Sequence, residues 1–360
     1  MLNYEFPPLG GGGGVAAKVL AKGFVKNGYV VDYITTWFPG LKEYEVVDGI
    51  HVHRVKVIGR KSLPTASMTS MMTFLLPAYR KGVLLCSTHK YAFINTHFAV
   101  PTGPVGVWLS RKFGIKNVLS LHGGDIYDPT KKFSPHRWRV LRATVRWVMN
   151  HSTVIVAQST NTRDNALKYY TPAKKIKIIP LPYEPFRFRK VSRKTLGLRA
   201  DRKYLIGVGR LVVRKRFDRI ISALPTLDKH IEALIIGSGP EEKNLQELAK
   251  SLKVTKRVHF LGQVSEEKKF QYLNVADLFV LSSEHEGFGI VLLEAMQVGL
   301  PIVATGEGGW EDLPIKKTQL NKKLFSRISR ENSFTKHNLI YKLQQFRSSI
   351  VANKYSKVVA

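Results

Sequence analysis

Two acidic residues lie eight positions apart, beside a glycine pair and an apolar helical pattern. Glu286 precedes Gly287 and Gly289, and Glu294 lies inside a helix predicted over residues 290–298. Free backbone N–H groups at the start of such a helix attract phosphate. A carboxylate repels phosphate, so we expect Glu286 to meet hydroxyls of a sugar ring and Glu294 those of a ribose. Taken singly, Glu286 is as well explained as a helix-start acid, and Glu294 as a solvated helical residue.

Two cations follow a different apolar run, which predicts a strand over residues 204–208. Arg210 comes two residues after this strand, and Lys215 lies five residues further along. A guanidinium offers a fork of hydrogen-bond donors and an ammonium offers a point charge, so the pair suits a diphosphate. In a chain with 57 Lys and Arg residues, each is equally explained as a surface residue.

A run of five glycines at residues 10–14 precedes a helix predicted over residues 15–27. Glycine lets the backbone approach a ligand closely, and the start of a helix favours an anion. The run lacks the G-x-G-x-x-G spacing of a dinucleotide site, and no acid ends a second strand about 20 residues on. An anion-binding loop and a flexible turn both remain open.

Apolar runs alternate with amphipathic stretches along the whole chain. The predicted strands cover residues 30–36, 51–57, 93–96, 117–121, 153–157, 176–180, 204–208, 233–236, 258–261, 278–281 and 302–304. The predicted helices cover residues 15–27, 67–85, 105–112, 135–150, 160–169, 216–225, 241–252, 266–275 and 290–298. Such strands indicate parallel sheets covered on both faces. Two series in tandem predict an α/β protein with two doubly wound Rossmann-like domains facing across a cleft, beyond the carboxyl ends of their strands.

The boundary between the two series is predicted at residues 180–200, which are rich in proline and charge and lack a core pattern. One helix is expected in the tail, near residues 334–346. The expected parts are a first domain at 1–182, a linker at 183–202, a second domain at 203–312 and a divergent tail at 313–360.

Taken together, the motifs resemble those of a known family. The stretches EGFGIVLLEAMQVGLPIVAT and VGRLVVRK resemble the nucleotide-sugar glycosyltransferases of the GT-B fold, specifically the large retaining family 4. Its E-x7-E signature is matched by Glu286 and Glu294, and its G-R-L…K element by Gly209, Arg210, Leu211 and Lys215. The stretch LSLHGGDIYDP looks like its H-G-x-D loop, with His122, Gly123 and Asp125. The glycine run is similar to its N-terminal G-G loop.

The resemblance covers roughly residues 1–312, and two stretches depart from it. Near the domain boundary, PLPYEPF stands where the family has an N-G-V-D-like turn. Beyond Asp312 the tail lacks the family's glycine-rich strand and a recognisable returning helix. Because an altered C-terminus puts domain closure in doubt, a degenerate, non-catalytic binder is one alternative.

The resemblance implies a role for each matched residue of the second domain. Arg210 and Lys215 would neutralise the diphosphate of a UDP-, GDP- or ADP-linked sugar. Glu294 would bind the ribose, and Glu286 would bind a donor-sugar hydroxyl as a catalytic residue. Backbone N–H groups at the helix start would assist at the diphosphate, from Gly287, Phe288, Gly289 and Ile290.

In the first domain, which would bind the acceptor, the resemblance places His122 near the reacting sugar as the second catalytic residue. A satisfied histidine at a strand end is the alternative. The glycine loop of the cleft would comprise Gly11, Gly12, Gly13 and Gly14. Family members transfer the sugar with retention, and the leaving phosphate is thought to help deprotonate the acceptor. The resemblance therefore implies no cofactor and no metal, and an acceptor glycan or lipid-linked sugar as the second substrate.

The charge balance indicates a polyanionic partner, since 57 Lys and Arg residues against 26 Asp and Glu residues give a net charge of +31. The basic residues are spread over both halves and form no recognised motif for reading a nucleic-acid sequence, so we expect no specific nucleic-acid partner. A basic nucleic-acid-binding protein remains the non-enzymatic alternative. Residues 135–150 and 68–86 combine apolar and basic side chains and are candidate contacts with an anionic membrane. A helix packed on the sheet with a basic outer face explains residues 135–150 as well.

The remaining composition narrows the class of protein. A hydrophobic content of 44% is typical of a globular chain, and a single cysteine, Cys86, excludes a disulfide framework. No signal peptide or membrane span is predicted, because Pro77, Arg80 and Lys81 interrupt the most apolar early stretch. We expect a cytoplasmic protein, with peripheral binding to the inner face of the cell membrane as an option. A sugar-nucleotide epimerase of the same fold is the second enzymatic alternative.

Overall fold

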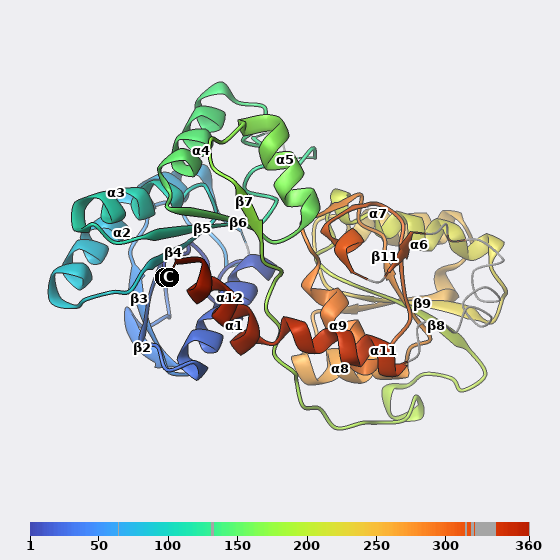
Figure 1. The fold of residues 1–360 in the computed structure, drawn as a ribbon. Coiled ribbons are helices and arrows are strands. Elements are labelled where there is room, and N and C mark those ends of the chain that lie inside the picture. The colour runs from blue at the N-terminus through green and yellow to red at the C-terminus, as the bar shows by residue number, and fades with distance from the viewer. Residues whose placement is uncertain (64, 131–132, 314, 318–319, 321–335, 360) are drawn as a thin grey trace. The chain divides into compact units, whose positions relative to one another are not determined.

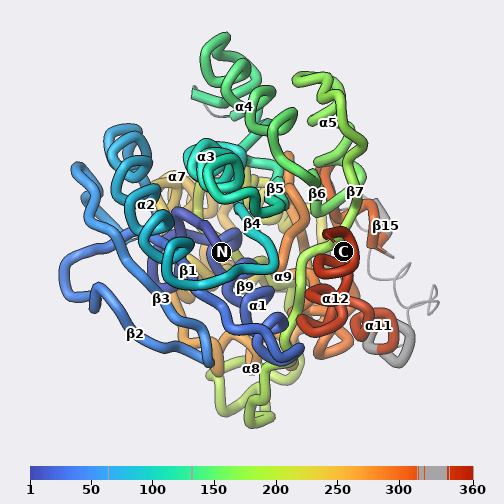
Figure 2. Tube along the Cα trace, turned by 60° about the vertical axis from the view of Figure 1, so that its left-hand side comes forward, coloured from blue at the N-terminus to red at the C-terminus, as the bar shows by residue number. Residues whose placement is uncertain are grey.

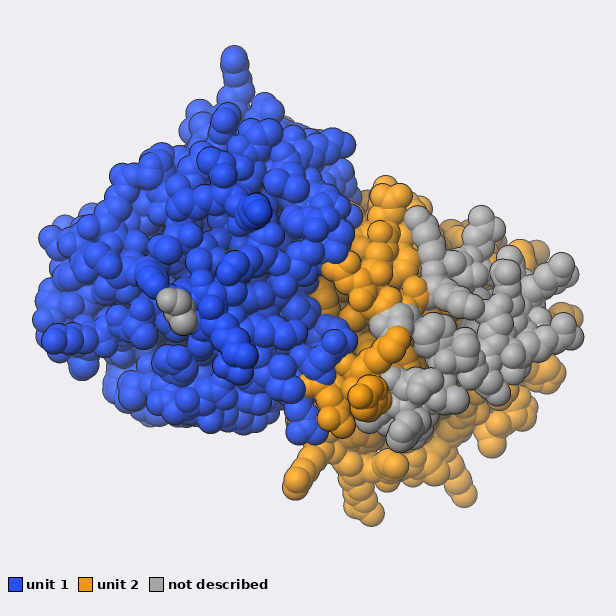
Figure 3. All heavy atoms as spheres, in the orientation of Figure 1, with its two compact units in different colours: residues 1–184, 345–360 blue, residues 185–344 orange. Residues whose placement is uncertain are grey.

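The structure of the protein is a computed structural model (Figure 1), which describes residues 1–360 except 64, 131–132, 314, 318–319, 321–335 and 360. The chain forms two compact units, coloured separately in Figure 3. Unit 1 comprises residues 1–184 and 345–360, and unit 2 comprises residues 185–344. Each unit alternates parallel strands with helices, which confirms the two predicted doubly wound α/β domains.

Unit 1 contains two groups of strands. One has the order β1 (Val31–Thr36), β3 (Ile50–Val55) and β2 (Tyr44–Val47), with β1 parallel and β2 antiparallel to β3. The other is parallel, in the order β4 (Ile94–His97), β5 (Asn117–Leu121), β6 (Val154–Ala157) and β7 (Ile176–Ile178). Leu2 forms a parallel bridge to Ile34 and another to Thr96, so the N-terminal segment joins the two groups.

Six helices of the described chain belong to unit 1: α1 (Gly12–Lys26), α2 (Met68–Thr88), α3 (Gly103–Phe113), α4 (Arg139–His151), α5 (Thr160–Tyr170) and α12 (Ser348–Val359). Two of them are capped by a serine at the N-terminus. Ser67 forms a capping box with Ser70 at the start of α2, and Ser159 accepts from the backbone N–H of Thr162 at the start of α5.

The last helix, α12, returns to unit 1 and packs along α1 (Figure 2). A Cβ atom at Gly23 would lie 2.2 Å from the carbonyl oxygen of Ser348, so this close approach needs a glycine. Tyr355 of α12 is buried in the same core as Phe24 of α1. The tail sequence showed no recognisable returning helix, and this prediction was wrong.

The main sheet of unit 2 is parallel, in the order β10, β9, β8, β11, β13, β15, and a short parallel pair joins β12 (His285–Glu286) to β14 (Glu307–Gly308). The strands of the main sheet are Val258–Gly262, Ile231–Ile236, Lys203–Val208, Leu278–Leu281, Ile302–Ala304 and Lys316–Lys317. Its helices are α6 (Phe217–Ala223), α7 (Glu242–Ser251), α8 (Glu266–Val275), α9 (Ile290–Val298) and α11 (Lys336–Leu343). The last of these, with a 3-10 turn at Gln344–Phe346, falls on the helix predicted near residues 334–346, of which 334 and 335 lie outside the described residues.

Most of the segment predicted as a linker packs within unit 2. Phe186 and Phe188 stack on Phe270 of α8, with ring centroids 5.0 and 5.5 Å apart. Arg193 donates to Asp277, beside β11, at 2.7 Å. The apolar rings within this charged stretch therefore order it against α8.

Candidate functional site

In unit 2, Lys215 and Glu286 form an ion pair between loops that follow neighbouring strands. Lys215 ends a 3-10 turn (Val213–Lys215) in the loop after β8, and Glu286 belongs to the short strand β12 (His285–Glu286) after β11. Their side chains are only 14% and 12% exposed. Ser283 also donates to Glu286 Oε2, at 3.1 Å. The structure thus joins one residue predicted to bind diphosphate with one predicted to bind sugar.

The charges around Glu286 keep its carboxyl group ionised. Burial alone would raise its pKa, but the positive charges of Lys215 and Arg214 outweigh this, and its pKa is lowered. The backbone is held closely as well, because a Cβ atom at Gly308 would lie 2.0 Å from the carbonyl oxygen of Glu286. Glu286 is therefore a fixed anion that can accept hydrogen bonds from hydroxyl groups.

Glu294 is a buried residue of α9 and not a solvated one. Its side chain is 12% exposed, and Oε1 lies 2.8 Å from Nζ of Lys269, whose side chain is 11% exposed. Oε2 is buried and has no hydrogen-bond partner among the described residues. Burial outweighs the favourable charge of Lys269, so the pKa of Glu294 is raised. One oxygen is held in place, and the other can still accept donors.

Lys269 of α8 is the residue that sequence reasoning missed at this site. Its ammonium also contacts both carboxylate oxygens of Glu266, each at 2.9 Å. A signal was present, because Lys269 shares the buried face of α8 with Leu273, one helical turn away. A lysine on an apolar face calls for a buried acidic partner.

The start of α9 has the geometry that an anion site needs. Gly289 is its N-cap, with φ of 88°, and as a glycine it has no side chain that could cap the first N–H groups. Ile290 begins the helix. Phe288 is 2% exposed, so this residue could contribute only backbone groups, as predicted for Gly287 to Ile290.

Arg210 lies in the same loop as Lys215. It is exposed and makes no ion pair within the described part of the chain. The backbone beside it packs tightly on the loop after β9, since a Cβ atom at Gly237 would lie 1.9 Å from the carbonyl oxygen of Gly209. Leu211 N–H donates to the carbonyl of Ser238 at 3.0 Å. Arg210 is therefore a cation without an ion-pair partner in the described chain, on a loop whose backbone packs closely against its neighbour.

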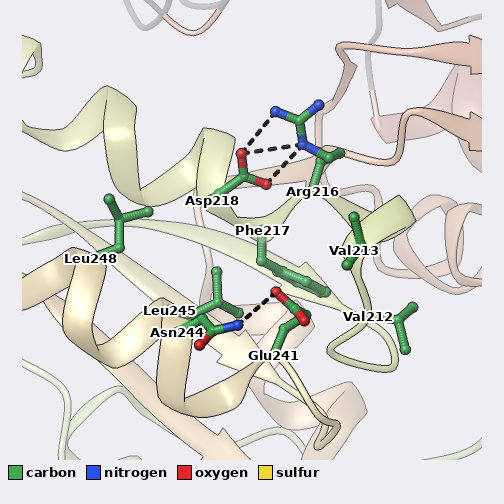
Figure 4. Close-up of a pocket in the computed structure, with 9 residues that line it drawn as sticks. All are labelled: Val212, Val213, Arg216, Phe217, Asp218, Glu241, Asn244, Leu245 and Leu248. Atoms are coloured by element: carbon green, nitrogen blue, oxygen red, sulfur yellow. Dashed lines mark hydrogen bonds and ion pairs between the residues drawn. The ribbon is translucent and has the colours of Figure 1, made fainter. Parts of the chain in front are cut away.

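A cavity of about 470 Å³ lies beside this loop (Figure 4). The residues that line it are Val212, Val213, Arg216, Phe217, Asp218, Glu241, Asn244, Leu245 and Leu248. None of the predicted site residues is among them, and its polar groups pair with one another, as Arg216 does with Asp218 at 2.9 Å. We therefore locate the site at the ion pairs and not in this cavity.

In unit 1, the glycine loop and His122 lie next to each other. A Cβ atom at Gly13 would lie 2.4 Å from Cζ of Phe98 and 3.5 Å from Nδ1 of His122. Gly11 is the N-cap of α1, which begins at Gly12, and its N–H donates to Glu5 at 3.1 Å. The lack of side chains in this loop thus brings its backbone against the histidine.

His122 has a partner for each ring nitrogen. Nε2 lies 2.9 Å from Nδ1 of His97, and Nδ1 lies 2.8 Å from Nε2 of Gln158. Asp125 fixes the backbone, accepting from the N–H groups of His122 at 2.9 Å and Ala99 at 2.7 Å. Burial lowers the pKa of His122 to about 3, so the ring is neutral at pH 7.

The described residues contain neither a cluster suited to a metal ion nor a helix suited to crossing a membrane. No cluster of three or more His, Cys, Asp or Glu side chains could hold a metal ion in that part of the chain. Nor does any helix found there have the length and apolar character that crossing a bilayer demands.

Comparison with known proteins identifies the class. The family model "Glycosyltransferase Family 4" matches residues 10–185, and "Glycosyl transferases group 1" matches residues 188–353. An uncharacterized glycosyltransferase of Methanocaldococcus jannaschii is 31% identical over 86% of this chain and 80% of its own. The chain therefore belongs to the family 4 glycosyltransferases of the GT-B fold. The second match runs past Asp312, which corrects the expectation that the family pattern ends there.

Two further relatives are informative. A GDP-mannose-dependent alpha-(1-6)-phosphatidylinositol monomannoside mannosyltransferase of Mycolicibacterium smegmatis is 26% identical, over 86% of this chain and 80% of its own. The crystal structure of Anabaena HepE in complex with UDP and glucose superposes with a TM-score of 0.74, at 19% identity, over 99% of this chain and 98% of that one. The latter likeness shows the shared fold.

Proposed function

We propose that the protein transfers a sugar from a nucleotide-sugar donor to a hydroxyl acceptor with retention of anomeric configuration. The observation that carries the proposal is Glu294, which has one oxygen held by Lys269 and a second, buried oxygen without a hydrogen-bond partner among the described residues. An unsatisfied buried acceptor costs about 1–3 kcal/mol, and more when it is charged. A ribose diol would supply the missing donors.

In this proposal, Arg210 and Lys215 bind the donor diphosphate. Lys215 carries three N–H donors, so it can keep Glu286 as a partner while it contacts a phosphate oxygen. The backbone at the start of α9 adds further donors. Negative charge grows on the departing diphosphate in the transition state, where these fixed positive groups stabilise it without a metal ion.

Glu286 would accept a hydrogen bond from the donor sugar, and His122 would line the acceptor side. A ring whose pKa is about 3 is a poor base at neutral pH, so His122 would position groups and not abstract a proton. That task would fall to the leaving phosphate, which departs from the face of the sugar that the acceptor hydroxyl approaches.

The acceptor is proposed to be a glycan or a lipid-linked sugar, reached from the cytoplasmic face of a membrane. On α4, a candidate membrane contact, Val145 and Val148 are fully buried, so this part of its apolar face packs into the core. The outer face of α2 is apolar instead: Met72, Leu76 and Leu84 are 60%, 54% and 56% exposed. Apolar groups beside cations favour an anionic membrane surface.

Flotation with liposomes tests the membrane contact. We expect recovery with anionic liposomes, which Leu76→Asp lowers, whereas Val213→Asp, a change at an equally exposed valine of unit 2, leaves it unchanged. Equal recovery with neutral and anionic liposomes would reject the contact.

Calorimetric titration with UDP, GDP, ADP and their sugars tests the donor class. We expect one nucleotide series to bind and to raise the melting temperature. NMR of the product then reads the anomeric configuration. An inverted product, or an epimerised donor with no transfer, would contradict the proposed reaction.

A further inference from the structure

A continuous chain of buried side chains connects α12 with His122 inside unit 1. Ser120 Oγ donates to the Tyr355 hydroxyl at 3.1 Å and accepts from Asn95 Nδ2 at 3.0 Å. Asn95 Oδ1 lies 2.8 Å from Nε2 of His97, whose Nδ1 lies 2.9 Å from Nε2 of His122. Every member before His122 is at most 2% exposed. Solvent is therefore not available to replace a missing partner along this chain.

The direction of the hydrogen bonds follows from Asn95. Its Nδ2 donates to the carbonyl of Val118 at 3.2 Å as well as to Ser120, so its oxygen must face His97. An amide oxygen only accepts, hence Nε2 of His97 carries the proton and its Nδ1 accepts. His122 must then donate from Nε2. Its own Nδ1 is left to accept from the amide of Gln158.

Two ionisable groups lie near these hydrogen-bonded side chains. Burial lowers the pKa of His97, and the neighbouring His122 ring and the Met1 amino group lower it further; the pKa of that amino group is itself lowered by burial to about 6. Asp125 faces the backbone of His122 through one oxygen. Neither group contacts a ring nitrogen of the two histidines, so the hydrogen bonds decide which nitrogen carries the proton.

We propose that Asn95 and Tyr355 are positioning residues of the transferase, which act through Ser120 and His97 to hold the His122 ring in its Nε2–H form. The inference rests on the proposed function for the claim that His122 faces the substrates. The C-terminal helix, 235 residues from Ser120 in sequence, then supports the site from the far end of the chain.

Nitrogen-15 NMR of the histidine rings is the direct test. In the wild type, both His97 and His122 should be protonated at Nε2 and not at Nδ1, with no titration near the ordinary value of about 6.5. Asn95→Asp puts a carboxylate against His97 Nε2 and should move the titration of the pair toward that value. A wild-type His122 protonated at Nδ1, or an unchanged spectrum in Asn95→Asp, would overturn the proposal.

Steady-state kinetics distinguish a role of Tyr355 in positioning His122 from a role in folding alone. Tyr355→Phe should lower kcat roughly five- to tenfold, the effect of one hydrogen bond, with KM for the donor unchanged. Ser356→Ala changes a residue of the same helix that does not belong to this series of hydrogen-bonded side chains, and it should leave kcat unchanged. Equal effects of both variants would overturn the role of Tyr355. If the NMR result is as expected and no donor is bound, the proposed function fails while the tautomer assignment stands.

Discussion

Replacing Glu294 with glutamine tests the ribose assignment with a change of almost no volume. In the wild type, Oε1 is held by Lys269 at 2.8 Å and the buried Oε2 has no described partner. Glutamine removes the negative charge and presents either a weaker acceptor or an NH₂ group. The ribose hydroxyls would therefore exchange charge-assisted hydrogen bonds for neutral ones or for none.

The size of the loss follows from the strength of those bonds. Hydrogen bonds to a charged group contribute about 1.5–3 kcal/mol, against about 0.5–1.5 kcal/mol for neutral ones. A net loss of about 1.5–3 kcal/mol corresponds to roughly 10- to 100-fold weaker nucleotide binding, since each 1.4 kcal/mol is a factor of ten.

Calorimetry with a nucleoside diphosphate and its 2′- and 3′-deoxy analogues measures how much of the binding free energy depends on both Glu294 and the ribose hydroxyls. The wild type should discriminate against the deoxy analogues, and Glu294→Gln should bind all of them with similar, weak affinity. Glu266→Gln is the matched control, because it also alters a partner of Lys269 but leaves Glu294 in place. If Glu294→Gln discriminates as well as the wild type does, the ribose assignment is wrong.

Three other outcomes are expected. Lys215→Met should weaken the binding of a nucleoside diphosphate about tenfold or more and leave the binding of the free nucleoside unchanged. Calorimetry that shows equal losses of affinity for both ligands would contradict the diphosphate role. Gly13→Ala should lower kcat, because the new methyl group meets the Phe98 ring, whereas Gly11→Ala, which meets open space, should not; equal rates would refute this. Asp32 has a pKa lowered to about 2 although burial opposes this, because hydrogen bonds from His53 and Tyr91 favour its charged form. Its stabilising effect is present above the ordinary aspartate pKa of 3.8 and is lost as pH falls toward 2. The free energy of unfolding of Asp32→Asn should therefore depend less steeply on pH in this range, and an unchanged pH dependence would argue against the assignment.

The sequence was sufficient for the architecture because buried parallel strands are apolar along their whole length. Such runs predicted β8 and β11, which are followed by the loops that carry Arg210, Lys215 and Glu286. The exposed strand β2 has no such run and was not predicted. The contact between Lys215 and Glu286 could not be predicted either, because 71 residues separate them and only the adjacency of β8 and β11 joins them.

Other parts of the site depend on packing that no local pattern reveals. From the sequence alone, Glu294 is explained as a solvated helical residue, whereas in the structure α8 places Lys269 against it. Likewise, the role of Tyr355 depends on the return of α12 to unit 1, which the divergent tail sequence conceals. Both are pairings between side chains far apart in the chain, and a single sequence does not specify them.

The most direct test of the central claim is a crystal structure with an unreactive 2-fluoro analogue of the nucleotide sugar that binds in calorimetry. We predict diphosphate oxygens within hydrogen-bond distance of Arg210 and Lys215, a ribose diol on the unpaired oxygen of Glu294, and the sugar beside Glu286. Density for the analogue at any other place in unit 2, with Glu294 Oε2 still unpartnered, would contradict the account.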